Sequence, residues 1–108
     1  MSILWHATPV DNRASIRERG LLCECSRGVM RVVWLHTLSM RADAVRWCAA
    51  SHLVELDQVA VLAVRISRLR VTRFRTGLWY TQSDVPADQL VWVYDPADHV
   101  VECVDAPF

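Results

Sequence analysis

The stretch that decides the fold is LWHATPVDNRASIRERGL, residues 4–21. It begins with an apolar run, expected to form a strand over residues 3–7, and turns polar at Thr8. Threonine is a good helix N-cap and proline is favoured at the first helical position, so residues 9–19 are expected to be a helix. Gly20 follows and is expected to end this helix in a left-handed conformation.

Apolar runs bounded by turn residues predict the other elements. Strands are expected over residues 31–37, 58–66, 71–74, 78–81, 89–94 and 100–104. A second helix is expected from Ser39 to about Val54, with a stripe of residues that face the core, namely Val45, Cys48, Ala49, His52 and Leu53. Two early helices and a later run of strands indicate an α+β fold. The length of 108 residues fits one domain over residues 1–108.

Composition and charge exclude some classes of protein. With 53% hydrophobic and 22% charged residues, the chain is not expected to be disordered. The formal net charge is zero, but residues 1–75 hold all 12 Arg and six acids, a net +6. Residues 76–108 hold six acids and no base, a net −6. The zero sum therefore does not exclude an anionic partner.

Neither the N-terminus nor the cysteines indicate a secreted or metal-binding protein. The first residues contain no basic segment and no long apolar run, so neither a signal peptide nor a membrane span is expected. The four cysteines, Cys23, Cys25, Cys48 and Cys103, lack the spacing of a zinc site or a disulfide scaffold. We expect reduced thiols, no metal, no membrane partner and a cytoplasmic location.

Two histidines stand at the ends of apolar strands. His6 follows Leu4-Trp5, and His36 ends the run VVWLH; each precedes a predicted helix. An imidazole so placed is suited to hold a ligand hydroxyl, and the neighbouring backbone of Ala7 offers a donor and an acceptor. The plainer interpretation of either His alone is a side chain that satisfies a turn. Two such strand ends in one chain are harder to explain in this way.

These segments resemble the ADP-ribosyltransferase superfold, and most closely the NAD lobe of the RNA 2′-phosphotransferase family. In that family an aromatic–His–Gly–Thr segment leads into a helix ending in Gly-Leu, like residues 5–8 and 20–21 here. Its next strand ends His-Val-His-Leu, and the last His matches His36. Its Asn-Gly-Val-Trp-Leu-Thr segment, followed by Val-Pro, resembles residues 76–81 and 85–86. The match covers roughly residues 3–94.

The resemblance implies an ADP-ribosyltransferase-like α+β fold with split antiparallel sheets and NAD bound as a substrate between them. His6 would bond a ribose hydroxyl, the Ala7 backbone would grip the carboxamide, and His36 would lie near the nicotinamide ring. The implied NAD-binding residues are His6, Ala7, Thr8, Arg27 and His36. The implied activity is transfer of ADP-ribose to a nucleic-acid or phosphate acceptor.

The family also has a catalytic arginine four residues before the last strand His, where this chain has Val32. We therefore expect the adjacent Arg31 to take the role of this arginine, since a bulge in the strand would bring it to the site. The implied catalytic residues are therefore His6, His36 and Arg31. At the place of the glutamate in another branch of the superfold stands Val85, near Asp88 and Gln89. The family's RNA-binding lobe matches no segment here, so a partner subunit that supplies it is one option.

Residues 65–75, RISRLRVTRFR, contain five arginines. The interleaved apolar residues indicate a solvated strand face, and the alternative is a ridge that contacts a pyrophosphate or a nucleic-acid backbone. The second hypothesis for function is therefore a non-catalytic module with a degenerate NAD cleft that binds nucleic acid or an acidic protein. Most of the five tryptophans are expected in the core. His52 and His99 are expected as helix-face and loop residues.

Overall fold

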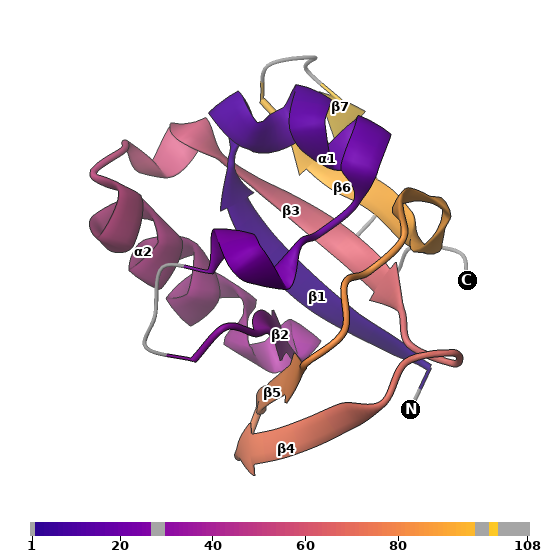
Figure 1. Ribbon diagram of the computed structural model, residues 1–108. Coiled ribbons are helices and arrows are strands. Elements are labelled where there is room, and N and C mark those ends of the chain that lie inside the picture. Colours follow the sequence, from indigo (N-terminus) through magenta and orange to yellow (C-terminus); the bar gives the residue numbers. More distant parts are fainter. Residues whose placement is uncertain (1, 27–29, 97–99, 102–108) are drawn as a thin grey trace.

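The computed structural model describes residues 2–26, 30–96 and 100–101 (Figure 1). Within them, seven strands form one antiparallel sheet in the order β4-β5-β2-β1-β3-β6-β7. The helices and strands are β1 (Ile3–Pro9), α1 (Arg13–Arg19), β2 (Val33–His36), α2 (Arg41–His52), β3 (Val59–Arg65), β4 (Val71–Arg75), β5 (Leu78–Thr81), β6 (Leu90–Asp95) and β7 (Val100–Val101). The predicted α+β class is confirmed. Neither helix is long and apolar enough to cross a membrane.

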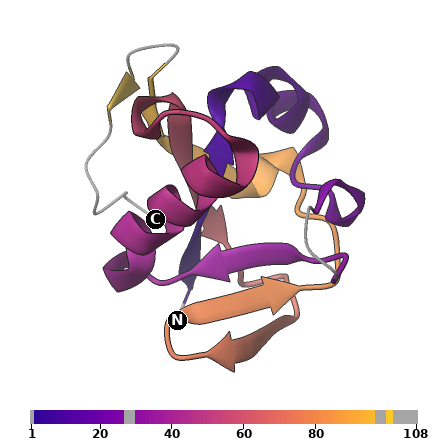
Figure 2. The ribbon, with the colours of Figure 1, turned by 90° about the vertical axis from the view of Figure 1, so that its left-hand side faces the viewer.

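The two helices cover opposite faces of the central strands. Side chains alternate along a strand, so Leu4 and Trp5 of β1 point to opposite faces of the sheet. Leu4 belongs to the core cluster that contains Ile16 of α1, whereas Trp5 belongs to a cluster against which Val45 of α2 packs. Figure 2 shows α1 and α2 on either side of β1. Because both faces are covered, β3 is buried from Val59 to Val64, as its continuous apolar sequence predicts.

The first helix begins later than predicted. β1 continues to Pro9 because Thr8 and Pro9 pair with residues of β3, so their backbone is extended and Thr8 is not an N-cap. A 3₁₀ turn over Val10–Asn12 follows, and α1 begins at Arg13. The Thr8 hydroxyl oxygen instead accepts a hydrogen bond of 3.3 Å from Asn12 Nδ2. Pairing with the central strand has overridden the local helix signal.

The second helix is also shorter than predicted. Ser39 lies in a 3₁₀ turn, where its hydroxyl lies 3.0 Å from that of Thr37, and α2 begins at Arg41. Cys48 and Ala49 are buried, as the stripe predicts. The prediction that Leu53 faces the core is wrong, because its side chain is 92% exposed. Leu53 takes a left-handed conformation with φ 56° just after the helix ends, which turns the side chain out of the stripe.

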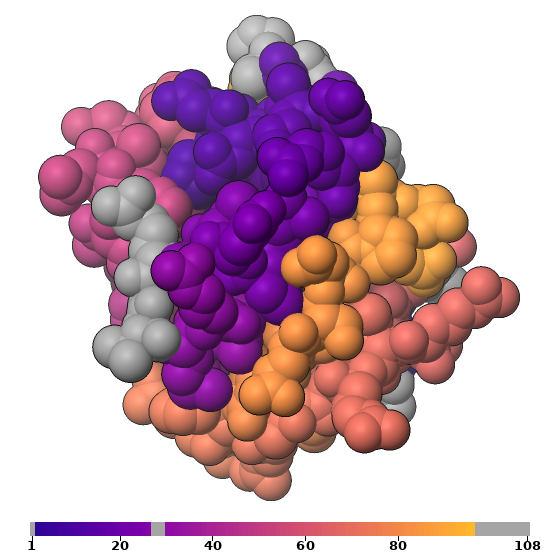
Figure 3. Space-filling model, viewed as in Figure 1, coloured from indigo at the N-terminus to yellow at the C-terminus, as the bar shows by residue number. Residues whose placement is uncertain are grey.

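The predicted strands are confirmed as β2 to β6, with ends shifted by at most two residues. Of the predicted strand 100–104, β7 contains Val100–Val101 and the rest lies outside the described residues. Gly20 has the predicted positive φ, 77°, and a Cβ there would lie 2.0 Å from the Val85 carbonyl oxygen. Leu21 and Val85 exchange two backbone hydrogen bonds, so the segment after α1 lies beside the segment before β6 (Figure 3).

The predicted split into two sheets is corrected by the structure, which has one continuous sheet. Among the residues that the structure describes, its two parts are connected only by a short pairing between β1 and β2. β1 pairs with β3 from Ile3 to Pro9, and β2 pairs with β5 from Val33 to His36. β1 and β2 themselves meet at the pair Trp5–His36. From that pair the two strands diverge, β1 towards Pro9 and β2 towards Val33. The divergence leaves room for a site between them.

Candidate functional site

A cavity of about 880 Å³ opens where β1 and β2 diverge. That volume lies in the range typical of small-molecule and cofactor sites. Its walls come from the two strands, from α1 and α2, and from the segment Gly20–Ser26 that follows α1. The predicted site residues that line it are His6, Ala7, Thr8 and His36. The structure therefore brings both strand-end histidines to one cavity.

His6 links the diverging strands through its side chain. Its Nδ1 lies 2.7 Å from the backbone oxygen of Trp34 in β2. A carbonyl oxygen only accepts, so Nδ1 carries the hydrogen and Nε2 is left with a lone pair. Burial, together with the smaller effects of the neighbouring His36 and His52, lowers the pKa of His6 from 6.5 to about 4, although the hydrogen bond to Trp34 acts in the opposite direction. At neutral pH His6 is an uncharged ring with a hydrogen-bond acceptor at Nε2.

His36 is more deeply buried, with 3% of its surface exposed. Its Nδ1 donates to the Thr37 backbone oxygen at 2.9 Å, so its Nε2 is again the acceptor. Burial lowers the pKa of His36, and the positive charge of Arg41 lowers it further. Within the described residues, Nε2 is buried and has no hydrogen-bond partner. An unsatisfied buried acceptor costs about 1–3 kcal/mol, which a ligand that donates a hydrogen bond would recover.

Ala7 and Thr8 contribute the edge of β1 to the cavity. Both pair with β3 on one side, opposite Val61 and Ala60, but the backbone of β2 has moved away on the other side. Successive residues of a strand direct their N–H and C=O groups to opposite edges. One of these two residues therefore turns a backbone donor and acceptor towards the side of β2. This is the kind of pair that recognises a carboxamide.

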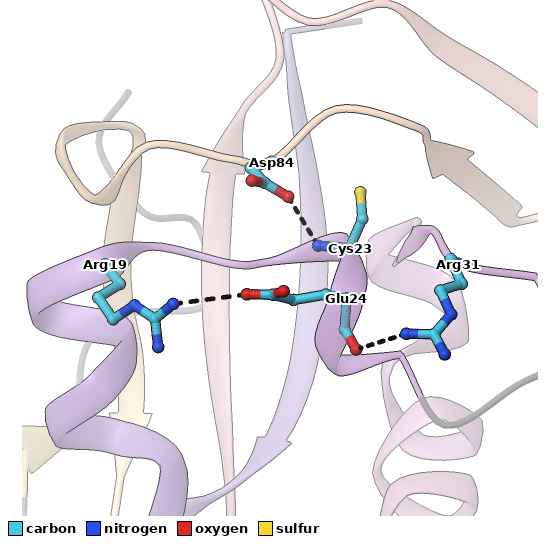
Figure 4. A network of polar contacts seen from close by, with 5 residues as sticks. All are labelled: Arg19, Cys23, Glu24, Arg31 and Asp84. Carbon is cyan, nitrogen blue, oxygen red and sulfur yellow. Dashed lines mark hydrogen bonds and ion pairs between the residues drawn. The ribbon is translucent and has the colours of Figure 1, made fainter.

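Arg31 does not lie at this cavity. It is exposed, and its Nη1 donates to the Glu24 backbone oxygen at 3.3 Å, while the Glu24 carboxylate pairs with Arg19 at 3.4 Å (Figure 4). β2 pairs with β5 in unbroken register, without the bulge that would have turned Arg31 inwards. Arg27, the other predicted arginine, lies outside the described residues.

A bulge does bring an arginine to the cavity, but in another strand. In β4, Arg73 lies opposite Trp79 while Arg75 lies opposite Leu78, with the register shift between them. Neighbouring residues of β5 face opposite sides, so Arg73 and Arg75 do as well. Arg75 and Leu78 line the cavity. The sequence marked Arg75 as one of five similar arginines, and no local signal distinguished it.

Several residues of α2 also line the cavity, among them His52 and Trp47. The guanidinium carbon of Arg75 lies 5.7 Å from the ring centroid of Trp47, so α2 and β4 meet at this wall. Sequence reasoning treated His52 as a helix-face residue and did not assign it to the site. A signal was present, because His52 is one turn from Cys48 on the predicted inward stripe, and Cys48 lines the same cavity.

The chemical groups around the cavity are neutral or cationic. Among the described residues that line it there is no Asp or Glu. The described part of the chain has no group of three His, Cys, Asp or Glu side chains that could hold a metal ion. Val85, which the resemblance would align with a glutamate, is fully buried and hydrogen-bonded to Leu21 through its backbone. The site offers acceptors and a guanidinium rather than a carboxylate base.

Comparison with known proteins does not assign the chain to a group: no family model matches it, and a search of curated proteins found no match.

Proposed function

We propose that the chain binds NAD in the cavity between β1 and β2 and transfers its ADP-ribose group to an acceptor. The observation that carries the proposal is that two neutral histidines, His6 and His36, line one cavity with acceptor nitrogens. NAD offers matching donors in its ribose hydroxyls and its carboxamide NH₂ group. The resemblance to the ADP-ribosyltransferase superfold selects NAD among the ligands with such groups.

The nicotinamide, its carboxamide, a ribose hydroxyl and the pyrophosphate of NAD each have a counterpart in the cavity. His6 accepts a hydrogen bond from a ribose hydroxyl, and the backbone edge at Ala7 and Thr8 holds the carboxamide. The buried Nε2 of His36 accepts from the nicotinamide end. Arg75 supplies the positive charge for the pyrophosphate, a role to which a guanidinium is suited. Arg31 is a weaker candidate for a catalytic role because it would first have to leave Glu24.

In the proposed reaction, the bond between the ribose C1′ and the nicotinamide nitrogen breaks and C1′ forms a bond to an acceptor oxygen. Nicotinamide leaves with the electron pair of the broken bond and becomes neutral. The transition state carries positive charge on the ribose, so orientation and electrostatics matter more than a strong base. An anionic phosphate oxygen needs no deprotonation, which suits a cavity whose described lining has no carboxylate. This favours a phosphate acceptor.

Calorimetric titration with NAD and two-dimensional NMR test the binding. We expect chemical-shift changes around His6 and His36, and about tenfold weaker binding in His6→Ala and in His36→Ala, the loss of one well-made hydrogen bond each. Arg73→Ala, on the opposite face of β4 from the cavity residue Arg75, is the matched control and should bind normally. No shift change at millimolar NAD would exclude the proposal.

Turnover needs a separate measurement. Chromatography should detect nicotinamide release that increases when a phosphorylated oligonucleotide is added, and His36→Ala should lose it. Release of nicotinamide without transfer of ADP-ribose to the oligonucleotide would contradict the proposal that a nucleic-acid phosphate is the acceptor. Nucleic-acid binding that survives in a His6→Ala, His36→Ala protein without NAD binding would favour the second hypothesis, a non-catalytic binding module.

A further inference from the structure

Part of one sheet face carries a group of aromatic side chains, of which one is exposed and two are half-buried. The rings of Trp34, Phe74 and Tyr80 form this aromatic face. Trp34 lies opposite Tyr80 in the pairing of β2 with β5, so both share a face with His36, two residues further along β2. The Trp34 ring centroid lies 5.1 Å from that of Phe74 and 5.5 Å from that of Tyr80, edge to face in both pairs. Phe74 is 53% exposed.

The strands that carry the aromatic face lie outside the part of the sheet on which α2 packs. α2 makes its main sheet contacts with β1 and β3. Figure 2 shows β2, β5 and β4 as three neighbouring strands below α2. Because Trp34 also lines the cavity, the aromatic face adjoins it directly. The face lies away from the body of α2 and continues from His36 towards β4.

Arginines stand at both ends of this face. Arg75 lines the cavity at one end. At the other end Arg70, Thr72, Gln82 and Ser83 line a second hollow of about 280 Å³, and Thr72 lies opposite Tyr80. All four of these side chains are exposed. Residues 65–83 contain five Arg and no Asp or Glu, so the charge on this part of the surface is positive.

We propose that this face binds single-stranded nucleic acid, with bases on Trp34, Phe74 and Tyr80 and phosphates at Arg70 and Arg75. Aromatic rings take unpaired bases of any sequence, and arginines contact the backbone between them. A strand bound here would lead to His36 and the cavity. That this strand is the acceptor of ADP-ribose rests on the proposed function. That the aromatic face binds the strand does not.

The combination of groups favours an unpaired strand over other anionic partners. A duplex offers phosphates but keeps its base faces stacked, so Phe74 would gain no partner from it. An acidic peptide would pair with the arginines and gain little from three aromatic rings arranged edge to face. Unpaired bases use both the rings and the charges, since each base has a flat face and each nucleotide a phosphate.

Fluorescence anisotropy with labelled oligo(dT) and oligo(U), each about 10 nucleotides long, tests the proposal and compares DNA with RNA. Phe74→Ala is expected to weaken binding at least about fivefold, because it removes one stacking ring. Arg70→Ala should lower the slope of log affinity against log salt concentration by about 0.7, the loss of one phosphate contact on a single strand. Arg70 is exposed, so Arg70→Ala should unfold at the same temperature as the wild type. Phe74→Ala also loses its ring contact with Trp34, so it should unfold at a slightly lower temperature but remain folded under the assay conditions.

Arg73→Ala is the matched control. It removes the same charge from β4 as Arg75→Ala would, but from the opposite face. We expect it to leave oligonucleotide affinity almost unchanged. Equal losses in Arg73→Ala and Arg70→Ala would overturn the proposal and indicate attraction by overall charge. Equal affinity for a duplex, or displacement of the oligonucleotide by polyglutamate at equal charge, would also overturn it, the latter in favour of an acidic protein partner.

The same variants separate this proposal from NAD binding. Phe74→Ala and Arg70→Ala should bind NAD normally, and the His6→Ala, His36→Ala protein should still bind the oligonucleotide. Oligonucleotide binding without NAD binding would support the role of the aromatic face and contradict the proposed function. NAD binding without oligonucleotide binding would do the reverse.

Discussion

The guanidinium carbon of Arg75 lies 5.7 Å from the ring centroid of Trp47, and this contact joins β4 to α2 where both line the cavity. Trp47 is 43% exposed, so the pair lies where the cavity meets solvent. A cation held over an aromatic ring at an exposed site gains about 0.5–1 kcal/mol. The contact therefore orients a positive charge at the cavity and leaves that charge intact, whereas a carboxylate partner would neutralise it.

The first prediction follows from that orientation. Arg75→Ala should weaken NAD binding about tenfold, the loss of a charge-assisted hydrogen bond to the pyrophosphate. Nicotinamide riboside, which has no pyrophosphate, should bind the variant and the wild type equally. Calorimetry with both ligands measures the two affinities. Arg73→Ala is again the control, and a loss of NAD affinity in it as large as in Arg75→Ala would contradict the assignment.

The case of Arg75 shows where sequence reasoning ends. The strands and the two histidines could be predicted because buried strands form apolar runs bounded by turn residues, and a polar residue stands out at the end of such a run. The bulge that turns Arg75 towards the cavity depends on the pairing of β4 with β5, which no local pattern encodes. The same limit explains Arg31, whose position depends on whether β2 has a bulge.

Thr8 shows a second limit. Its sequence context, Thr-Pro before a polar stretch, is typical of a helix start. The extended backbone is set instead by pairing with Ala60 of β3, far away in the sequence. Local propensities amount to about 1 kcal/mol, and contacts in a buried sheet outweigh them. This error did not affect the placement of Thr8 at the site, because Thr8 still lines the cavity.

The second prediction concerns pH. The unfolded chain binds a proton at His6 near pH 6.5, whereas the folded protein does so only near pH 4, because the pKa of His6 is lowered to about 4. Between these values the unfolded state holds more protons, so the folded state loses stability as the pH falls from about 6.5 to about 4. At about 1.4 kcal/mol per pH unit, the loss from His6 is about 3 kcal/mol. The lowered pKa of His36 adds to it in the same direction.

Urea unfolding at several pH values measures this loss, and NMR titration of the imidazole C–H signals gives the pKa of each histidine directly. His6→Gln cannot take up a proton, so its free energy of unfolding should fall less with acidification than that of the wild type. A pKa of His6 above 6 in the folded protein would contradict the burial of its ring.

The third prediction concerns the attachment of α1 to the sheet. Asp95 of β6 is fully buried, and its carboxylate lies 3.1 Å from Arg17 Nη2 and 3.7 Å from Arg13 Nη1. Asp95→Ala would leave two arginines of α1 without this carboxylate. Because both arginines are partly exposed, the loss is that of a charge-assisted hydrogen bond, and the free energy of unfolding should fall by about 1.5–3 kcal/mol. Chemical denaturation measures the change.

Asp43→Ala is the matched control, because Asp43 pairs with Arg46 on the surface of α2. An exposed pair of this kind contributes at most about 1 kcal/mol. Equal effects of the two substitutions would show that the Asp95 cluster does not hold α1 in place. Amide hydrogen exchange in α1 should rise in Asp95→Ala and remain unchanged in Asp43→Ala.

The last prediction uses the cysteines as reporters of the cavity. Cys25 and Cys48 both line it, but Cys25 is exposed whereas burial raises the pKa of Cys48 to about 11. The thiolate is the reactive form, so iodoacetamide at about pH 8 should alkylate Cys25 first and Cys48 slowly. Bound NAD should slow the alkylation of Cys25, because it would cover that wall of the cavity.

Mass spectrometry of the digested protein follows each cysteine separately, so reaction at Cys103 does not interfere. Cys23 is the internal control: it does not line the cavity, and its Sγ lies 3.7 Å from the Thr81 backbone oxygen. Burial, with Asp84 nearby, raises the pKa of Cys23, so it should react slowly with or without NAD. If NAD binds by calorimetry but leaves the alkylation rate of Cys25 unchanged, the dinucleotide lies elsewhere than against the Cys25 wall of this cavity.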